Sequence, residues 1–364
     1  MNSHPRRWSW KIAEIADIGV YVHSTFALLL LWIAFSFWSD RHSIRFVLSG
    51  LAFVISLFAC VTLHEFGHAL TARQFGIRTR DITLLPIGGI ARAERIPRDP
   101  KQELAVAIAG PVVTVLIAAT LFLWLRVTNR WEPFARVTMT TGPFLERLMF
   151  VNLALAGFNM LPAFPMDGGR VLRALLALRM PYARATAIAA RLGQTVALVF
   201  GIVGLFGNPV LVLIALFVWF GAAQESGSAQ LEAAVVGVPV RHLMQTEFRT
   251  LSPTDSLTRA AGLLLRGTQP HFPVVDGDRV VGLLTKADLI AGLSRHGEEA
   301  PVADAMRHNP LSVDAAEPLD NTLHRLREFP GTVALVTDQG RLVGLLSPNS
   351  LADFVRLQAA RRRE

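Results

Sequence analysis

Charged residues are scarce in this chain. Aspartate, glutamate, lysine and arginine make up 18% of its 364 residues, against roughly 25% in an average soluble protein. Cysteine is almost absent, and the single Cys60 excludes an intramolecular disulfide and fits a reducing compartment. The net charge of +8 comes from scattered arginines without a dense basic stripe, so nucleic-acid binding is not expected. The shortage of charge indicates a membrane protein.

Long apolar runs fill the first part of the chain. Several reach the roughly 20 residues that a helix needs to cross a bilayer, whereas the polarity after about residue 225 is that of a globular protein. We expect about six transmembrane helices, at residues 20–38, 44–75, 104–126, 144–161, 185–206 and 209–223. The predicted fold is a polytopic α-helical membrane domain over residues 1–223, in the cell membrane, followed by a soluble part.

Basic residues predict how the chain crosses the bilayer. They gather after the second predicted helix and after the fourth: Arg73, Arg78, Arg80, Arg92, Arg95, Arg98, Lys101, Arg170, Arg173, Arg179 and Arg184. The positive-inside rule places both connections in the cytoplasm, and the weaker basic loop near Arg130 is outnumbered. Because six crossings return to the starting side, both termini and the soluble part are expected in the cytoplasm.

One connection has too few residues and too much polarity to span a bilayer. In residues 80–96, Pro86 and the pair Gly88-Gly89 separate two short runs with β character. We expect a hairpin or a re-entrant loop beside the helices, because irregular backbone at that depth needs protein or water to satisfy its amides.

An apolar run ends in the sequence "LHEFGH", residues 63–68, although ionisable side chains within a span are costly and usually functional. His64 and His68 are four residues apart, so on a helix they share one face and can bind one metal ion. Glu65 stands beside them without being a ligand. This pattern is typical of a zinc hydrolase, in which the ion activates a water molecule and the carboxylate is the general base.

A catalytic zinc usually has three protein ligands, so a third must come from elsewhere. Most acidic residues of the membrane part, Glu103 and Glu146 among them, fall in predicted polar connections. Asp167 instead lies between apolar stretches, in a segment that prolines and glycines break. At 1.5 Å per helical residue, His64 and Asp167 both lie roughly 30 Å from the outer face. This matched depth makes Asp167 the candidate ligand.

The motifs "HEFGH" and, downstream, "NMLPAFPMDGGR" give the chain a resemblance to the site-2 protease family of intramembrane zinc metalloproteases. The resemblance implies that a transmembrane segment of a substrate protein is cleaved. It implies zinc on His64, His68 and Asp167, with Glu65 as the general base.

The second motif departs from the short Asn-Pro-Asp-Gly form of the family, because no asparagine directly precedes Pro165. Family members with CBS domains commonly show this longer version. The resemblance implies that Asn159 and Pro165 line the loop that meets the substrate.

Peptide hydrolysis requires an extended backbone, so a helical substrate has to unwind near the metal. The hairpin that contains Gly88 and Gly89 either offers the substrate a strand edge for β-addition or is a structural loop. The sequence leaves both alternatives open.

The soluble part repeats itself. Met306 follows Met244, and Gly344 follows Gly282, at the same interval of 62 residues. Such a repeat implies two copies of one small unit. We expect a linker at residues 224–237, repeats at 238–297 and 298–358, and a basic tail at 359–364.

Each repeat alternates helices with short strands, and the pair resembles a CBS-pair domain of the α/β class. In this family such pairs often bind adenine nucleotides. Thr285 and Asp288 of the first copy match the residues that contact phosphate and ribose, whereas Ser350 replaces the acid in the second. The resemblance implies at most one site for ATP, ADP or AMP. The alternative is a structural or homodimerising pair.

The sequence therefore predicts an intramembrane zinc endopeptidase that a cytoplasmic CBS pair modulates. The alternative is an ion channel or transporter gated by the CBS domains, with "HEFGH" as an ion site along its path. A transporter needs ligands but no general base, so it gives no reason for Glu65 at this position.

Overall fold

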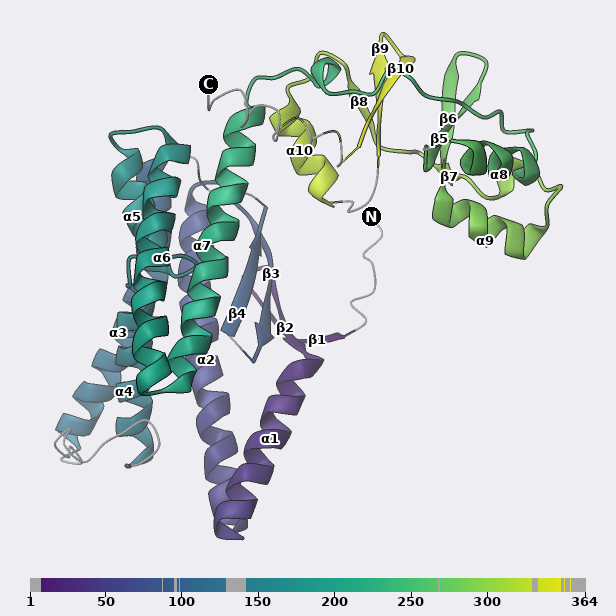
Figure 1. Cartoon of the computed structure of the whole chain (residues 1–364). Coiled ribbons are helices and arrows are strands. Elements are labelled where there is room, and N and C mark those ends of the chain that lie inside the picture. The colour runs from purple at the N-terminus through teal and green to yellow at the C-terminus, as the bar shows by residue number, and fades with distance from the viewer. Residues whose placement is uncertain are drawn as a thin grey trace. The chain divides into compact units, whose positions relative to one another are not determined.

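The computed structural model describes residues 8–86, 88–94, 97, 99–128, 142–267, 269–328, 333–347, 350 and 354 (Figure 1). The chain divides into two compact units, Met1–Ala229 and Gln230–Glu364, which are considered separately. The predicted basic tail at 359–364 lies outside the described residues. The helices of the first unit are α1 (Ser24–Arg41), α2 (Ile44–Gln74), α3 (Pro100–Val127), α4 (Phe144–Asn159), α5 (Asp167–Ala177), α6 (Tyr182–Phe206) and most of α7 (Pro209–Val235), whose last residues are counted in the second unit.

Four helices in the described part of the chain are long and apolar enough to cross a membrane, namely α2, α3, α6 and α7. The apolar part of α1 is shorter, at Ser24–Ser39, and α4 has 16 residues. The predicted membrane domain is confirmed, but the count of six spans is not.

The first predicted span begins too early. Residues 20–23 belong to strand β2 (Ile18–His23), and α1 starts only at Ser24. β2 follows β1 (Ser9–Ile15) across a tight turn in which Ala16 and Asp17 both have positive φ, the conformation of a type I′ hairpin turn. The last helix, by contrast, continues past its predicted end and makes most of the expected linker helical.

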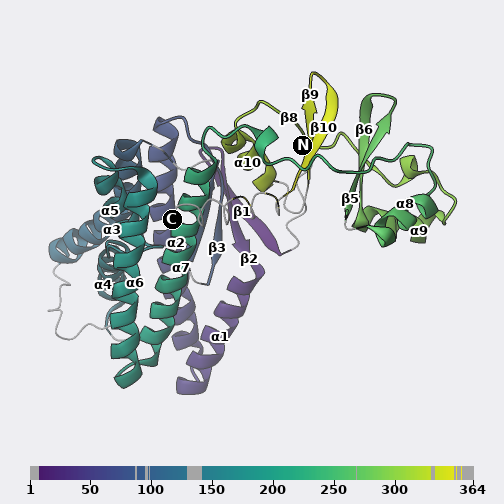
Figure 2. The same ribbon diagram turned by 45° about the horizontal axis from the view of Figure 1, so that its top comes forward.

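A four-stranded sheet in the order β1-β2-β3-β4 packs against α2 (Figure 2). Strands β3 (Thr79–Leu85) and β4 (Gly88–Ala93) form the predicted hairpin, and β3 pairs in parallel with β2. Ile82 of β3 and Phe66 of α2 lie in one buried apolar cluster. The sheet therefore packs on a face of α2 that carries Phe66, away from the face on which His64 and His68 meet α3.

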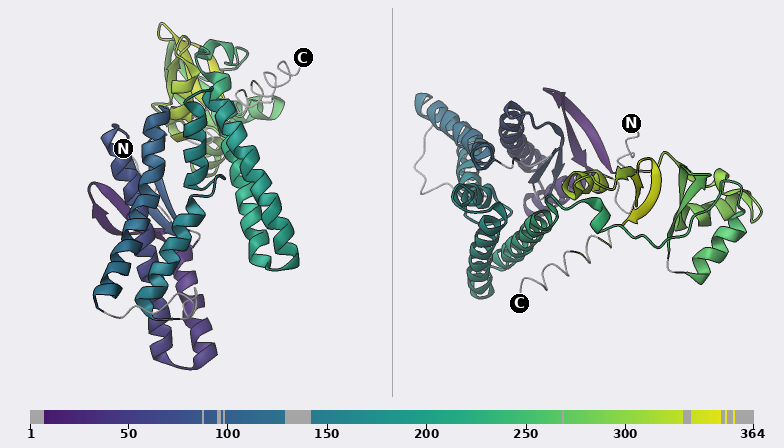
Figure 3. Two further views of the ribbon diagram at one scale, coloured as in Figure 1. Left: turned by 90° about the vertical axis from the view of Figure 1, so that its left-hand side faces the viewer. Right: turned by 90° about the horizontal axis from the view of Figure 1, so that it is seen from above.

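Helices α6 and α7 form an antiparallel pair (Figure 3). The helices approach closely at Gly204, where an added Cβ atom would lie 2.8 Å from the backbone nitrogen of Val212. The connection between α4 and α5 packs on this pair, because Ala163 and Met166 share a buried cluster with Ala197 of α6 and Val218 of α7. The packing fixes the connection that leads to Asp167.

The second unit contains two three-stranded sheets, β5-β6-β7 and β10-β9-β8. Its elements are β5 (His271–Asp276), β6 (Arg279–Thr285), β7 (Arg307–His308), β8 (Ser312–Asp314), β9 (Ala334–Asp338), β10 (Arg341–Leu346), α8 (Leu257–Arg266), α9 (Lys286–His296) and α10 (Leu319–Glu328). The repeats exchange their first segments. An added Cβ atom at Gly344 would lie 2.7 Å from the sulfur of Met244, and one at Gly282 would lie 2.4 Å from that of Met306. Each methionine thus packs on the glycine of the other repeat.

Candidate metal centre

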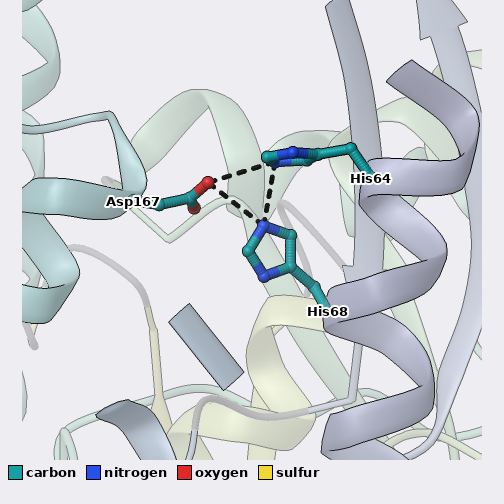
Figure 4. A group of neighbouring side chains, drawn as sticks. All are labelled: His64, His68 and Asp167. Carbon is teal, nitrogen blue, oxygen red and sulfur yellow. Dashed lines mark hydrogen bonds and ion pairs between the residues drawn. The ribbon is translucent and has the colours of Figure 1, made fainter. Parts of the chain in front are cut away.

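Helix α2 carries both histidines of the "HEFGH" motif on its buried face (Figure 4). His64 and His68 are 7% and 8% exposed, and their Nε2 atoms are 3.1 Å apart. Oδ2 of Asp167 lies 3.1 Å from each of these nitrogens. The three residues that the sequence singles out are thus brought together, with their ligand atoms at the corners of a triangle.

Helix α3 orients the two imidazole rings. Nδ1 of His68 donates to the carbonyl oxygen of Val106 at 2.7 Å. Nδ1 of His64 lies 2.8 Å from Oγ1 of Thr114, and that hydroxyl donates to the carbonyl of Gly110 at 3.3 Å. Because the hydroxyl hydrogen is already used, Nδ1 of His64 is the donor to Thr114. Both rings therefore present the lone pair of Nε2 to the centre of the cluster.

A close approach of α3 to α2 makes this arrangement possible. A Cβ atom added at Gly110 would lie 2.2 Å from Nε2 of His68 and 2.7 Å from Nε2 of His64. Within the motif itself, a Cβ atom at Gly67 would lie 2.8 Å from the carbonyl oxygen of Ala109. Glycine is needed at both positions, because the imidazole rings leave no room for a side chain at Gly110 and the backbone of α3 leaves none at Gly67.

Asp167 reaches the histidines from the first residue of α5. The chain turns tightly before it, since the amide of Met166 donates to the carbonyl of Ala163 at 3.0 Å. A Cβ atom at Gly168 would lie 2.3 Å from the carbonyl of Leu161, and one at Gly169 would lie 2.7 Å from the backbone nitrogen of Phe164. Because neither residue has a side chain, the first turn of α5 can pack directly on the backbone of the segment that connects α4 to α5.

The cluster fits a zinc ion. Two lone pairs of imidazole nitrogen and one carboxylate oxygen face one another at 3.1 Å, an arrangement that is repulsive unless a cation lies among them. Zinc bonds of about 2.0–2.1 Å at tetrahedral angles separate ligand atoms by roughly 3.3 Å. Rings whose second nitrogen is hydrogen-bonded are also typical of zinc ligands. The donor set and its spacing thus suit zinc with one position left open.

Glu65 follows the first histidine and is half-buried. In the described part of the chain no hydrogen bond or ion pair joins its carboxylate to another residue. Strand β4 lies directly over it, because a Cβ atom at Gly89 would be 2.8 Å from Cγ of Glu65. The hairpin that the sequence predicts therefore borders the metal centre, and Gly89 gives the side chain its space.

The other predicted substrate residues lie in and beside the connection between α4 and α5. Asn159 is the last residue of α4 and is half-buried, whereas Pro165 is exposed. A Cβ atom at Gly221 of α7 would lie 2.6 Å from Cδ of Pro165, so that helix packs on the proline.

Two acidic residues that were expected in polar connections are buried inside helices. Glu103 lies in the first turn of α3 and Glu146 in the first turn of α4, at 2% and 1% exposure. Arg173, one of the basic residues expected in a cytoplasmic connection, is 1% exposed on α5. Its side chain bonds to Glu103 and Glu225, so it cannot serve as a solvent-exposed topology signal.

The predicted nucleotide residues lie in the second unit, at the end of β6 and the start of α9. Oγ1 of Thr285 accepts from the amide of Asp288 at 3.2 Å and caps α9. The Asp288 carboxylate receives two hydrogen bonds from Arg307, at 2.7 and 3.1 Å. The carboxylate is thus already paired with a guanidinium that the sequence did not single out.

Comparison with known proteins gives matches over both units. The model of peptidase family M50 matches residues 52–141 and 126–200, and the CBS domain model matches residues 240–295 and 302–356. Zinc metalloprotease MJ0392 of Methanocaldococcus jannaschii is 31% identical over 346 residues, which are 94% of this chain and 95% of that protein.

Two solved structures are also similar. The site-2 protease from Methanocaldococcus jannaschii is 39% identical, covers 60% of this chain and 95% of its own, and has a TM-score of 0.45. CBSX2, a protein of Arabidopsis thaliana, is represented by a complex with AMP. That chain is 25% identical, covers 34% of this chain and 99% of its own, and has a TM-score of 0.31.

Proposed function

This chain belongs to peptidase family M50, the site-2 protease family of zinc metalloproteases, and we propose that it cleaves a transmembrane segment of a substrate protein at the cluster of His64, His68 and Asp167. The observation that carries the proposal is the buried triangle of three ligand atoms beside the carboxylate of Glu65. The family match favours a protease over a channel or transporter, because an ion path requires no general base.

Zinc, when bound, supplies Lewis-acid activation of water and of the peptide carbonyl. Nε2 of His64, Nε2 of His68 and Oδ2 of Asp167 would hold the ion, and the hydrogen bonds to Thr114 and Val106 fix the orientation of the two rings. Glu65 takes a proton from the attacking water as the new C–O bond forms. It then gives that proton to the amide nitrogen as the C–N bond breaks.

The purified chain is expected to cleave a single-span test protein, and a zinc chelator is expected to abolish cleavage. Removing the metal leaves Glu65 with no activated water to deprotonate. Product formation on gels, with and without chelator, is the measurement, and added zinc should restore activity. Cleavage that persists after zinc has been removed, as shown by elemental analysis, would contradict the proposal.

Strand β4 supports a way to hold the substrate. It is the last strand of its sheet, so its outer edge has no strand partner in the described structure. An extended peptide that pairs with this edge would pass beside Glu65, because Gly89 lies against that side chain. We assign Gly88 and Gly89 to substrate binding, together with Asn159 and Pro165 in the connection that carries Asp167.

The soluble unit is assigned to the cytoplasm, together with both termini. This orientation is supported by the basic connections that remain after the buried Arg173 is discounted, including Arg78, Arg80, Arg179 and Arg184. Protease protection of the CBS unit in sealed vesicles of known orientation would check it.

An adenine nucleotide is expected to bind the CBS pair through the first copy, at Thr285 and Asp288. A ribose there has to share or displace Arg307, which holds the Asp288 carboxylate. Hydrogen bonds to a charged group contribute about 1.5–3 kcal/mol, so Asp288→Ala should weaken binding by about 10- to 100-fold and Ser350→Ala should weaken it little. Calorimetry of the full chain in detergent with ATP, ADP and AMP is the measurement.

Two outcomes would change this assignment. Equal losses of nucleotide affinity in Asp288→Ala and Ser350→Ala would show that assigning the site to the first copy is wrong. The absence of binding heat or competition for all three nucleotides would leave the CBS pair as a homodimerisation element.

A further inference from the structure

Helix α5 carries a buried arginine almost two turns after Asp167. Arg173 is 1% exposed, and its Nε donates to Oε1 of Glu103 at 2.7 Å. Its Nη1 donates to Oε1 of Glu225 on α7. The guanidinium of Arg173 thus joins helices α3, α5 and α7, near the residue at which α3 begins.

Two aromatic rings fix the direction of this guanidinium. Cζ of Arg173 lies 4.9 Å from the ring centroid of Phe164 and 4.9 Å from that of Tyr182. Arginine stacks on aromatic faces through its planar charge, which lysine cannot reproduce. Phe164 directly precedes Pro165 in the connection between α4 and α5. Through its contact with Phe164, Arg173 therefore holds this connection as well as helix α5.

The bond to Glu103 links the two elements that shape the metal centre. Glu103 lies one turn before Val106, whose carbonyl orients His68, and the same helix carries Thr114 against His64. Asp167 is the first residue of α5, the helix that carries Arg173. Because a buried charge without its partner is costly, the pair holds α5 against α3 and thereby holds the carboxylate against the imidazoles.

The bond to Glu225 adds α7 to this assembly. Glu225 is one turn after Gly221, where α7 packs on Pro165. The side chain of Glu225 is 28% exposed, whereas that of Glu103 is 3% exposed. Loss of the bond to Glu103 should therefore cost more than loss of the bond to Glu225, because water can hydrogen-bond to the partly exposed Glu225 carboxylate.

We propose that Arg173 is a positioning residue for the metal centre: by bonding Glu103 and Glu225 while stacked between Phe164 and Tyr182, it sets the place of the Asp167 carboxylate. It touches neither the metal ligands nor the substrate. The inference rests on the proposed function, because it concerns Asp167 as a zinc ligand.

The test uses the full chain in detergent and measures metal binding as well as cleavage. Loss of a hydrogen-bond partner of a metal ligand typically weakens metal affinity by about 10- to 100-fold. We expect a loss within this range for Arg173→Lys and Glu103→Gln, because either change displaces the Asp167 carboxylate. Glu225→Gln should cause a smaller loss. Competition with a chromophoric chelator gives zinc affinity, and the visible spectrum of the cobalt-substituted protein should change because the carboxylate has moved.

A matched control distinguishes displacement of the Asp167 carboxylate from a general loss of protein stability. Met149 is 1% exposed between α3 and α4, away from the ligands, and Met149→Ala should lower the melting temperature without changing zinc affinity or the cobalt spectrum. Wild-type zinc affinity and spectrum in Arg173→Lys would overturn the inference. An equal loss of zinc affinity in Met149→Ala at matched stability would overturn it too.

Should Arg173→Lys fail to fold, a triple variant removes every charge of the network at once. Arg173→Met with Glu103→Gln and Glu225→Gln leaves no buried unpaired charge. It should fold with zinc affinity about 10- to 100-fold below that of the wild type. Wild-type affinity in this variant would refute the positioning role.

Measurements on Asp167→Ala show whether the positioning role of Arg173 has failed or the proposed zinc site itself has failed. If Asp167→Ala loses zinc and the Arg173 variants do not, only the positioning role fails. If Asp167→Ala keeps full zinc and full activity, the proposed ligand set itself fails, and the positioning role fails with it.

Discussion

Glu65→Gln is expected to retain zinc and to lose cleavage by about 10²- to 10⁴-fold, the usual contribution of a general base. The amide keeps the size of the side chain and its place beneath Gly89, but it cannot accept a proton from water. His64, His68 and Asp167 are unchanged, so metal content should stay at the wild-type value. Single-turnover cleavage and elemental analysis on the same preparation are the measurements.

The matched control is Glu94→Gln, which neutralises an exposed carboxylate just after β4 and should leave both quantities unchanged. Cleavage by Glu65→Gln at the wild-type rate would refute the assignment of the base. An inactive variant that still binds substrate also tests the strand edge. A photo-crosslinker at Ile90, which is 48% exposed on β4, should capture the substrate in the Glu65→Gln background.

Gly110→Ala is expected to reduce bound zinc below detection while the helices remain folded. The added methyl group would lie 2.2 Å from Nε2 of His68 and 2.7 Å from Nε2 of His64, so it displaces two ligands at once. Alanine favours a helix over glycine by about 1 kcal/mol, so helix propensity opposes unfolding.

Metal content by elemental analysis and helix content by circular dichroism measure the two expectations separately. Gly157→Ala is the control, since Gly157 is on α4 and a Cβ atom there meets nothing within 4 Å. It should keep zinc and activity. Full zinc occupancy in Gly110→Ala would show that the metal does not lie at the triangle of ligand atoms.

Features that depend on local geometry could be predicted from the sequence. The spacing of His64 and His68 fixes their shared face, because a helix repeats every 3.6 residues. Asp167 could be selected because it is an acid between apolar stretches, in a segment broken by proline and glycine. Turn residues near Gly88 indicate a hairpin or a re-entrant loop, and the pairing of β3 with β4 shows that the segment is a hairpin.

Features that depend on contacts between distant segments could not be predicted from the sequence. The first span was begun too early because the parallel pairing of β2 with β3, which joins Val20 to Ile82, has no local signal. Arg173 resembled a cytoplasmic topology charge, since nothing nearby in the sequence indicates Glu103 or Glu225 as its partners.

The sequence by itself therefore determined the membrane class, the repeated soluble part and the shared helix face of His64 and His68, because each depends on composition or on spacing within one element. Only the tertiary structure decided which groups complete the centre. Gly110 and Thr114 are ordinary residues of an apolar helix until α3 approaches α2 closely enough for one to admit the imidazoles and the other to orient His64. That approach is a property of packing between helices, which no single stretch of sequence encodes.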